Sequence, residues 1–87
     1  MATYLDPALA DELLIRFTYT APRADQPERY QRIRAAALDL ALLIADLAPP
    51  SRERDHALDR LDEVVMHANA AIARRESPDA IDALLDD

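Results

Sequence analysis

Two long stretches of the chain carry apolar residues at alternating spacings of three and four, and prolines separate them. The first stretch has these positions at Tyr30, Ile33, Ala37, Leu40, Ile44 and Leu47. The second has them at Leu58, Leu61, Val65, Ala68 and Ile72. This spacing places each set along one side of an α-helix, as in the seam of a coiled coil. Because only the short link APPS joins the two stretches, the pattern predicts an antiparallel helical hairpin.

A shorter helix is predicted ahead of the hairpin. Asp6 is a good N-cap residue, and Pro7 suits the first helical position, where no backbone donor is needed. The helix is expected to end at about Phe17, with Leu9 and Leu13 on the same face as Phe17. The segment TYTAPRAD then forms a connector to the next helix.

Prolines and a serine set the limits of the hairpin helices. Pro27 marks the start of the first, and Pro49 and Pro50 end it because neither can donate to the helical ladder. Ser51 is a suitable N-cap for the second. Residues 77–87 are predicted to form a short acidic helix or tail. We therefore expect one all-α domain over residues 1–87: a short N-terminal helix, a long antiparallel αα-hairpin and this C-terminal extension.

Several apolar residues lie off the two seams. Leu38, Leu43, Val64 and Ala71 give the hairpin helices a second apolar stripe. A chain of 87 residues buries only a modest core by itself. Self-association would remove this stripe from water, at about 25 cal/mol per Å² of apolar area. The sequence therefore predicts a homo-oligomer.

Composition excludes several classes of chemistry. The chain has no glycine and no cysteine, and each of its basic residues is arginine. Glycine-rich phosphate loops and disulfide frameworks are therefore excluded. The formal net charge of −7 argues against binding to duplex nucleic acid, but it leaves room for a local pocket that takes a small anion. No apolar run approaches the length of a membrane span, and the N-terminus lacks the basic region of a signal peptide, so a cytoplasmic protein is expected.

The cations and aromatic rings gather in one segment. Residues 16–34, RFTYTAPRADQPERYQRIR, hold five of the ten arginines and three of the four aromatic residues. Tyr19 lies in the connector, off any seam, and nucleobases stack on such rings. Guanidinium groups match phosphate oxygens, and the start of a helix offers free N–H groups. The segment has the parts of a nucleotide-phosphate site. From the residues alone, a solvated face with Arg29, Arg32 and Arg34 in ion pairs is the favoured interpretation, because exposed arginines are common.

Other polar residues have simpler interpretations. Asp55, Asp59, Asp62 and Glu63 share one side of the second hairpin helix. A metal site built by such carboxylates usually needs acids from a facing helix as well, so a solvated acidic face is the better interpretation. His56 and His67 are eleven residues apart and are too distant to bind one ion within a chain.

Three polar residues near the end of the second hairpin helix leave alternatives open. Asn69 lies beside the seam and either fixes the register of a helix interface or is solvated. Arg74 and Arg75 suit the last turn of a helix, where cations oppose the dipole. Alternatively, they belong to an anion site that several subunits form around a symmetry axis.

Four blocks, in order and at similar spacings, resemble the small phage-encoded anti-CBASS sponge proteins, which share a hairpin domain. The blocks are RFTYTAP, QPERY with the arginine beyond it, PPSRER and ANAAIAR, and the resemblance covers about residues 14–76. It implies a non-catalytic protein that sequesters the cyclic oligonucleotides of bacterial CBASS defence and so starves the effector of its activator. It also implies a helical hexamer that binds cyclic dinucleotides between paired protomers and cyclic trinucleotides where three protomers meet.

The resemblance assigns roles to individual residues. The base-stacking tyrosine of the family falls on Tyr19, and the basic residue that contacts the phosphates falls on Arg34. Thr20, at a position where the family often has histidine, is placed in the same cyclic-dinucleotide pocket. Arg74, with Arg75 and Asn69, is assigned to the candidate cyclic-trinucleotide site. The resemblance implies no metal or cofactor, and no duplex nucleic acid or membrane as a partner. It places the protein in the cytoplasm of the infected bacterial host.

Two other functions fit the residues. The first is a helical adaptor subunit whose apolar stripes bind another protein. The second is a metal-dependent nucleotide hydrolase built on the acidic face.

Overall fold

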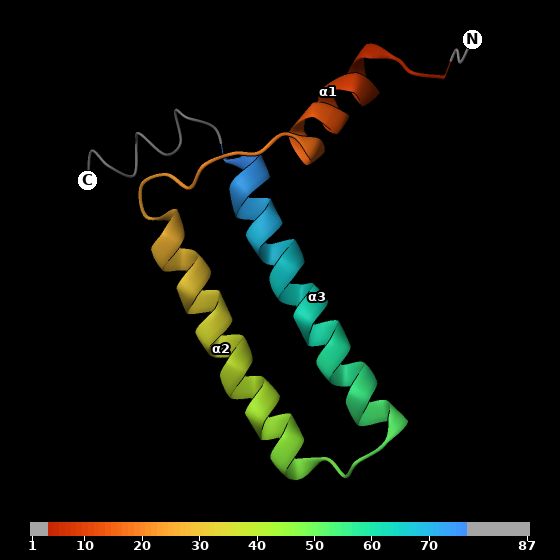
Figure 1. The fold of residues 1–87 in the computed structure, drawn as a ribbon, viewed down its shortest axis with the longest axis vertical. Helices are drawn as coiled ribbons and strands as arrows, with labels where there is room; N and C mark the ends of the chain where they lie inside the picture. Colours follow the sequence, from red (N-terminus) through yellow and green to blue (C-terminus); the bar gives the residue numbers. More distant parts are fainter. Residues whose placement is uncertain (1–3, 77–87) are drawn as a thin grey trace.

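The computed structural model describes residues 4–76, and all regular structure in that range is helical. Helix α1 spans Pro7–Phe17, α2 spans Gln26–Leu47 and α3 spans Arg52–Arg75. Helices α2 and α3 lie antiparallel, and α1 projects from the open end of this hairpin (Figure 1). The predicted short helix and the predicted αα-hairpin are both confirmed. The predicted C-terminal helix or tail lies outside the described residues.

Side-chain caps begin two of the helices, as predicted. At the start of α1, the Asp6 carboxylate accepts a hydrogen bond from the Leu9 backbone N–H at 2.8 Å. At the start of α3, the Ser51 hydroxyl accepts one from the Arg54 backbone N–H at 3.1 Å. Each bond satisfies a donor that the first helical turn would otherwise leave unpaired.

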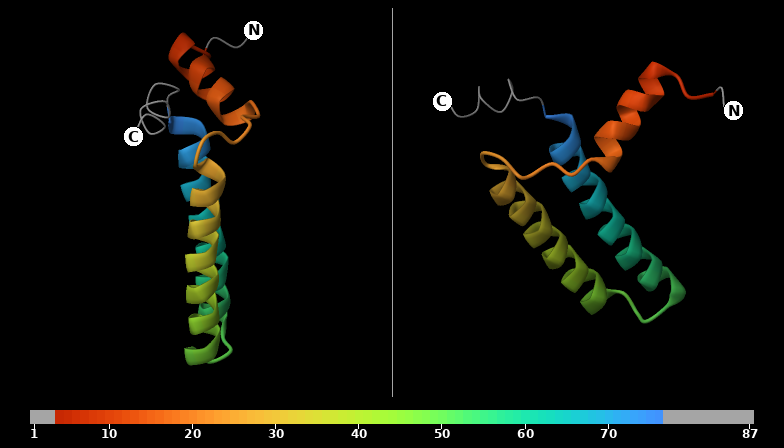
Figure 2. Two further views of the ribbon diagram at one scale, coloured as in Figure 1. Left: turned by 90° about the vertical axis from the view of Figure 1, so that its left-hand side faces the viewer. Right: turned by 45° about the horizontal axis from the view of Figure 1, so that its top comes forward.

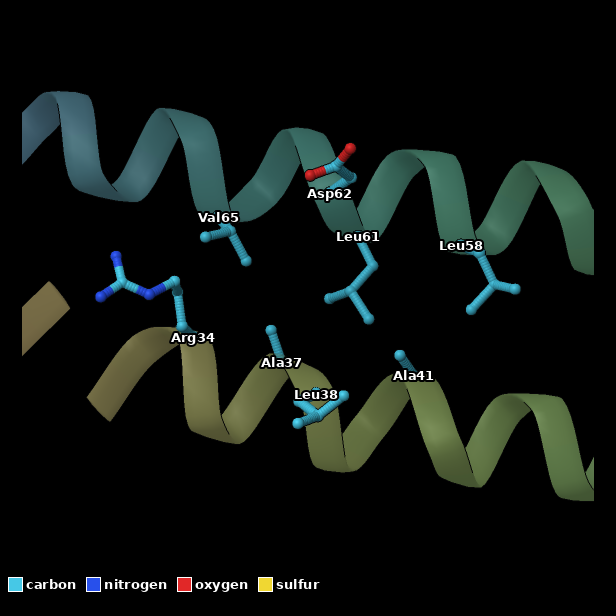
Figure 3. Close-up of a pocket in the computed structure, with 8 residues that line it drawn as sticks. All are labelled: Arg34, Ala37, Leu38, Ala41, Leu58, Leu61, Asp62 and Val65. Atoms are coloured by element: carbon cyan, nitrogen blue, oxygen red, sulfur yellow. The ribbon is translucent and has the colours of Figure 1, made fainter. Parts of the chain in front are cut away.

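The predicted seam residues of α3 are confirmed, and those predicted for α2 are partly wrong. The side of α2 that faces α3 carries Ala41, and the C-cap residue Ala48 continues this side; both are half-buried and stand in place of the predicted Leu40 and Leu47. Those leucines are 46% and 71% exposed. Neighbouring residues on an α-helix point about 100° apart, so a shift of one residue turns each leucine away from α3. Alanines of α2 thus oppose larger side chains of α3 (Figure 3).

The hairpin is a single layer, and much of its apolar surface faces outward. Seen edge-on, α2 and α3 overlap almost completely (Figure 2, left). Large apolar side chains of the hairpin with exposed fractions between 46% and 71% are Leu38, Leu40, Leu42, Leu43, Leu47, Val64 and Met66. In the described part of the chain, no helix has the length and apolarity needed to cross a membrane.

The cap of α3 gives a test of the fold. Replacing Ser51 by Ala removes the hydroxyl that accepts from the Arg54 N–H, and it should lower the free energy of unfolding by about 1 kcal/mol. Urea unfolding followed by circular dichroism, at one fixed protein concentration, measures the change. Ser51→Asp is the matched control, because aspartate keeps an N-cap acceptor and should unfold like the wild type. Equal stability of the Ala and wild-type chains would contradict the cap.

Candidate ligand-binding site

The candidate site residues come from three parts of the fold. Tyr19 and Thr20 lie in the connector of residues 18–25 between α1 and α2, and Arg34 lies in the first half of α2. Asn69 and Arg74 lie in the last half of α3. The antiparallel arrangement brings the start of α2 and the end of α3 to the same open end of the hairpin, where the connector crosses (Figures 1 and 2).

Arg74 lies between two open depressions. The Arg34 depression, of about 410 Å³, is lined by Tyr30, Arg34, Met66, Asn69, Ala70, Ala73 and Arg74. The connector depression, of about 390 Å³, is lined by Leu14, Ile15, Thr18, Thr20, Ala73 and Arg74. The fold therefore brings Arg34, Asn69 and Arg74 together in one depression, and it places Thr20 on the other side of Arg74.

Arg34 also lines an interhelical groove. This groove, of about 440 Å³, runs between α2 and α3 and is lined by Arg34, Ala37, Leu38, Ala41, Leu58, Leu61, Asp62 and Val65 (Figure 3). Apolar side chains make up most of the lining, and the Arg34 guanidinium lies at one end. The sequence pattern does not predict this groove. The one feature of the sequence that relates to it is the pair of small residues Ala37 and Ala41 on the α2 side.

Arg34 makes no ion pair within the described chain, a property that it shares with Arg23, Arg32, Arg52, Arg54 and Arg74. Among residues 4–76, ion pairs engage Arg16, Arg29, Arg60 and Arg75, and none engages Arg34. Arg34 is also exposed. A guanidinium that is free of carboxylates and borders apolar surface can bind an anion that carries a flat apolar group.

Tyr19 is separate from these depressions in a single chain. Its side chain is 85% exposed, and it lines neither the two depressions nor the interhelical groove. One copy of the chain therefore does not form a closed pocket with Tyr19 and Arg34 on facing walls. The assignment of Tyr19 to a ligand remains a prediction.

Ionic contacts hold the end of α1 on the last turn of α3. The Arg75 guanidinium donates to both oxygens of the Glu12 carboxylate, each at 2.8 Å. Glu12 also accepts from Arg16 Nε at 2.6 Å. Arg74 donates to the Arg16 backbone carbonyl at 3.3 Å. A phosphate that binds Arg75 would thus compete with Glu12, whereas Arg74 is engaged by one long hydrogen bond. The sequence pattern does not single out Glu12.

A second set of polar contacts fixes the start of α2 to the same turn of α3. Helix α2 begins at Gln26, one residue before the predicted proline, and the Gln26 side chain is only 1% exposed. Its amide bridges the connector and α3, with Glu76 among its partners. Arg29 donates to both Glu76 oxygens, at 2.7 and 3.0 Å. These hydrogen bonds from Arg29, followed by the one from Gln26, lower the pKa of the Glu76 carboxyl.

Asn69 has an unsatisfied acceptor. Its Oδ1 atom is buried and accepts no hydrogen bond from residues 4–76. A buried acceptor without a donor costs free energy, so a donor from a ligand or from a neighbouring protomer would be favourable. A buried Oδ1 favours the interface interpretation of Asn69 over the solvated one, and it also fits the ligand-site role that the resemblance implies.

The acidic face of α3 does not form a metal site in the described chain. Within residues 4–76, no group of three or more His, Asp or Glu side chains is arranged to hold an ion. Glu63, one member of this face, pairs with Arg60 at 2.8 Å. This pairing fits the solvated face that the sequence favours.

Fold and site together define a small helical hairpin with a free arginine beside apolar depressions. A comparison with protein-family models gave a match to the Acb2/Tad1 hairpin domain over residues 10–73. The chain therefore belongs to the Acb2/Tad1 hairpin family, the family of anti-CBASS cyclic-oligonucleotide sponges. The resemblance noted in the sequence is confirmed. Searches of curated proteins and of solved structures gave no match.

The family gives the coarse character of the protein. It is a family of non-catalytic binding domains whose ligands are cyclic oligonucleotides. The match covers α2 and most of α1 and α3, so it includes the connector with Tyr19 and Thr20 as well as Arg34 and Asn69.

Acid titration tests the contact between α1 and α3. Hydrogen bonds from Arg75 and then Arg16 lower the pKa of the Glu12 carboxyl from its ordinary 4.5 to about 2. Because folding lowers this pKa, the contribution of Glu12 to stability is present above about pH 4.5 and is lost as the pH falls through about 2. An NMR titration of the Glu12 side-chain carboxyl should have its midpoint near pH 2.

Arg75→Gln provides the control for that titration. Removing the guanidinium should move the Glu12 midpoint back toward 4.5 while the hairpin amide signals stay in place. A wild-type midpoint close to 4.5 would show that α1 is not held by this contact in solution.

Proposed function

We propose that this protein is a phage anti-defence sponge. It binds cyclic oligonucleotide second messengers, above all cyclic dinucleotides, and sequesters them intact, so that the CBASS effector of the infected host is not activated. Its place of action is the host cytoplasm. One observation carries the proposal beyond the family match: Arg34 is free of ion pairs in the described chain and borders both an apolar groove and a depression. No metal or cofactor takes part.

The proposed contacts follow from the chemistry of a cyclic dinucleotide, which has two phosphates and two flat bases. The Arg34 guanidinium binds a phosphate through charge-assisted hydrogen bonds. The exposed ring of Tyr19 stacks on a base, and stacking of this kind contributes about 1–3 kcal/mol per base. The Thr20 hydroxyl, in the same connector, makes a hydrogen bond to the ligand, either as a donor or as an acceptor.

A two-fold interface supplies each contact twice. An isologous dimer presents the same patch from both subunits, so two copies bring two Tyr19 rings and two Arg34 guanidiniums to a ligand with matching symmetry. This arrangement accounts for the incomplete pocket of a single chain. The exposed leucines of α2 provide apolar area for such an interface, and we propose that the pairs assemble further into a hexamer.

The second proposed site takes cyclic trinucleotides where three protomers meet. Arg74, which shares the Arg34 depression with Asn69, would contact a phosphate, and three copies would serve the three phosphates of the ligand. Arg75 takes part only if the phosphate replaces Glu12 as its partner. The unsatisfied Oδ1 of Asn69 fits a hydroxyl or amino donor of the ligand better than a phosphate.

An adaptor subunit is the second candidate function. The observation that favours it is the row of exposed leucines along α2, which another helical protein could cover as well as a second copy. On this hypothesis, changing Tyr19 and Arg34 would leave function intact, and changing the leucines would not.

Calorimetry with cyclic di- and trinucleotides tests the sponge directly. Tyr19→Ala and Arg34→Ala should each weaken cyclic-dinucleotide binding by about 30-fold or more, because each removes a stacking or charge-assisted contact of about 1–3 kcal/mol from both sides of the ligand. Helical content and oligomer mass should not change. Chromatography of the ligand after incubation should return it intact, with or without Mg²⁺.

Arg32→Ala is the matched control for the arginine variant. Arg32 lies two residues from Arg34 on the same helix and lines a different depression, with Arg29, Ile33, Ala36 and Ile72. The Arg32→Ala variant should therefore bind the ligand like the wild type. Equal losses for Arg32→Ala and Arg34→Ala would mean that net charge, and not a site at Arg34, governs binding. No detectable binding across the panel at micromolar concentration would refute the sponge and leave the adaptor.

A further inference from the structure

Both ends of the connector that carries Tyr19 are fastened to one place, the last turn of α3. On the α1 side, Arg74 and Arg75 hold Arg16 and Glu12. On the α2 side, the side chain of Gln26 makes the link. Figure 2 shows the connector passing across the end of α3 between these two points. The two ends of the connector are therefore held at the last turn of α3, which lies more than fifty residues from Tyr19 in sequence.

Gln26 is the centre of the second fastening. Its Oε1 accepts a hydrogen bond from the Arg23 backbone N–H at 2.9 Å. Its Nε2 donates to the Ile72 carbonyl at 3.3 Å and to Glu76 at 3.0 Å. Among residues 4–76 it is the only side chain that is fully buried. An amide is seldom the most buried group of a chain, and it is tolerated here because its oxygen and both N–H donors are all paired.

The turn that Gln26 closes contains a strained residue. Gln26 also donates its backbone N–H to the Arg23 carbonyl at 3.0 Å, so side chain and backbone close the same turn twice. Ala24, which lies between Arg23 and Gln26 in sequence, has a φ of 51°, in the left-handed region that its Cβ disfavours. Such strain persists only where the surrounding contacts determine the backbone conformation. Gln26 makes those contacts.

An ion-pair network supports Gln26 from one side. Glu76, which accepts from Gln26, also accepts two hydrogen bonds from Arg29, and Arg29 pairs with Asp25 at 3.1 Å. Arg29 is thus engaged at the end of the connector and is not free to bind a ligand, although it belongs to the cluster of arginines in residues 16–34. The network has a local, structural use that is distinct from the proposed role of Arg34.

We propose that Gln26 is a positioning residue for ligand binding, which holds the connector on α3 so that Tyr19 is ordered before the ligand arrives. This inference rests on the proposed function of Tyr19. A loop that is ordered only on binding loses conformational entropy at that moment, and a loop that is already fixed does not. The three bonds of the Gln26 amide supply that prior order, although Gln26 itself is buried and lies outside the depressions described above.

A double-mutant cycle on ligand affinity tests the proposal. The full chain is titrated with a cyclic dinucleotide by calorimetry, as wild type, Gln26→Ala, Tyr19→Ala and the double variant. Gln26→Ala should weaken binding about tenfold with helical content and oligomer mass unchanged. Because Gln26 acts through the connector, Tyr19→Ala should have much less effect in the Gln26→Ala background than in the wild type.

A direct measurement of the connector accompanies the cycle. In the wild type without ligand, the Arg23 amide hydrogen should exchange slowly with solvent, since Gln26 accepts it, and in Gln26→Ala it should exchange freely. If Gln26→Ala does not fold, Gln26→Glu replaces it. A carboxylate at this position has no N–H to donate to the Ile72 carbonyl and lies against the Glu76 carboxylate, so this variant should also weaken binding.

The possible outcomes distinguish a failure of the positioning role of Gln26 from a failure of the proposed sponge function. If Tyr19→Ala weakens binding and Gln26→Ala does not, the positioning role is wrong and the sponge stands. If the two effects multiply independently in the double variant, Gln26 does not act through Tyr19. If Gln26→Glu folds and binds like the wild type, the hydrogen bonds from Gln26 to Ile72 and Glu76 are not what positions the connector. If Tyr19→Ala leaves affinity unchanged, the proposed contact of Tyr19 fails, and the role of Gln26 fails with it.

Discussion

A hairpin of two helices can bury only one stripe of each helix, and this limit governs the rest of the molecule. Helices α2 and α3 use that stripe against each other, with alanines of one facing larger side chains of the other. What remains is a thin layer with leucines on its surface and one fully buried side chain in the described residues, that of Gln26. Such a layer has no interior in which a ligand could be enclosed. An enclosed site would therefore need a partner surface in addition to the described residues, and a second copy in the proposed function supplies it.

The distribution of charged side chains also fits a thin hairpin that has no enclosed interior. The chain is acidic overall, and two of its arginines are engaged in local ion pairs that hold the fold together. Arg29 and Arg75 hold the connector and α1 in place through Glu76 and Glu12. Arg34 is left without an ion pair in the described chain. A small ligand with few phosphates needs only this local cation, repeated by symmetry.

The sequence predicted features that depend on near neighbours. The caps at Asp6 and Ser51 and the stop at the paired prolines act within one turn, and all were confirmed. The seam of α2 was partly wrong because apolarity alone favoured Leu40, whereas helix geometry places Ala41 against α3.

The links from Gln26 to Glu76 and from Glu12 to Arg75 could not have been predicted, since they join residues 50 and 63 positions apart. For the candidate sites, the sequence assigned Arg34 to one site and Arg74 with Asn69 to another, whereas the structure brings all three residues into one depression. The roles of Tyr19 and Thr20 depend on a neighbouring copy and a ligand. A single chain leaves them as predictions.

Native mass spectrometry of the protein, with and without a cyclic dinucleotide, tests the central claim that intact ligand is held between copies of the chain. The account predicts an assembly with an even number of chains, six as proposed, that gains one ligand of unchanged mass for every two chains. A monomer that binds one ligand per chain would contradict it, and so would an assembly that carries the mass of a hydrolysed product.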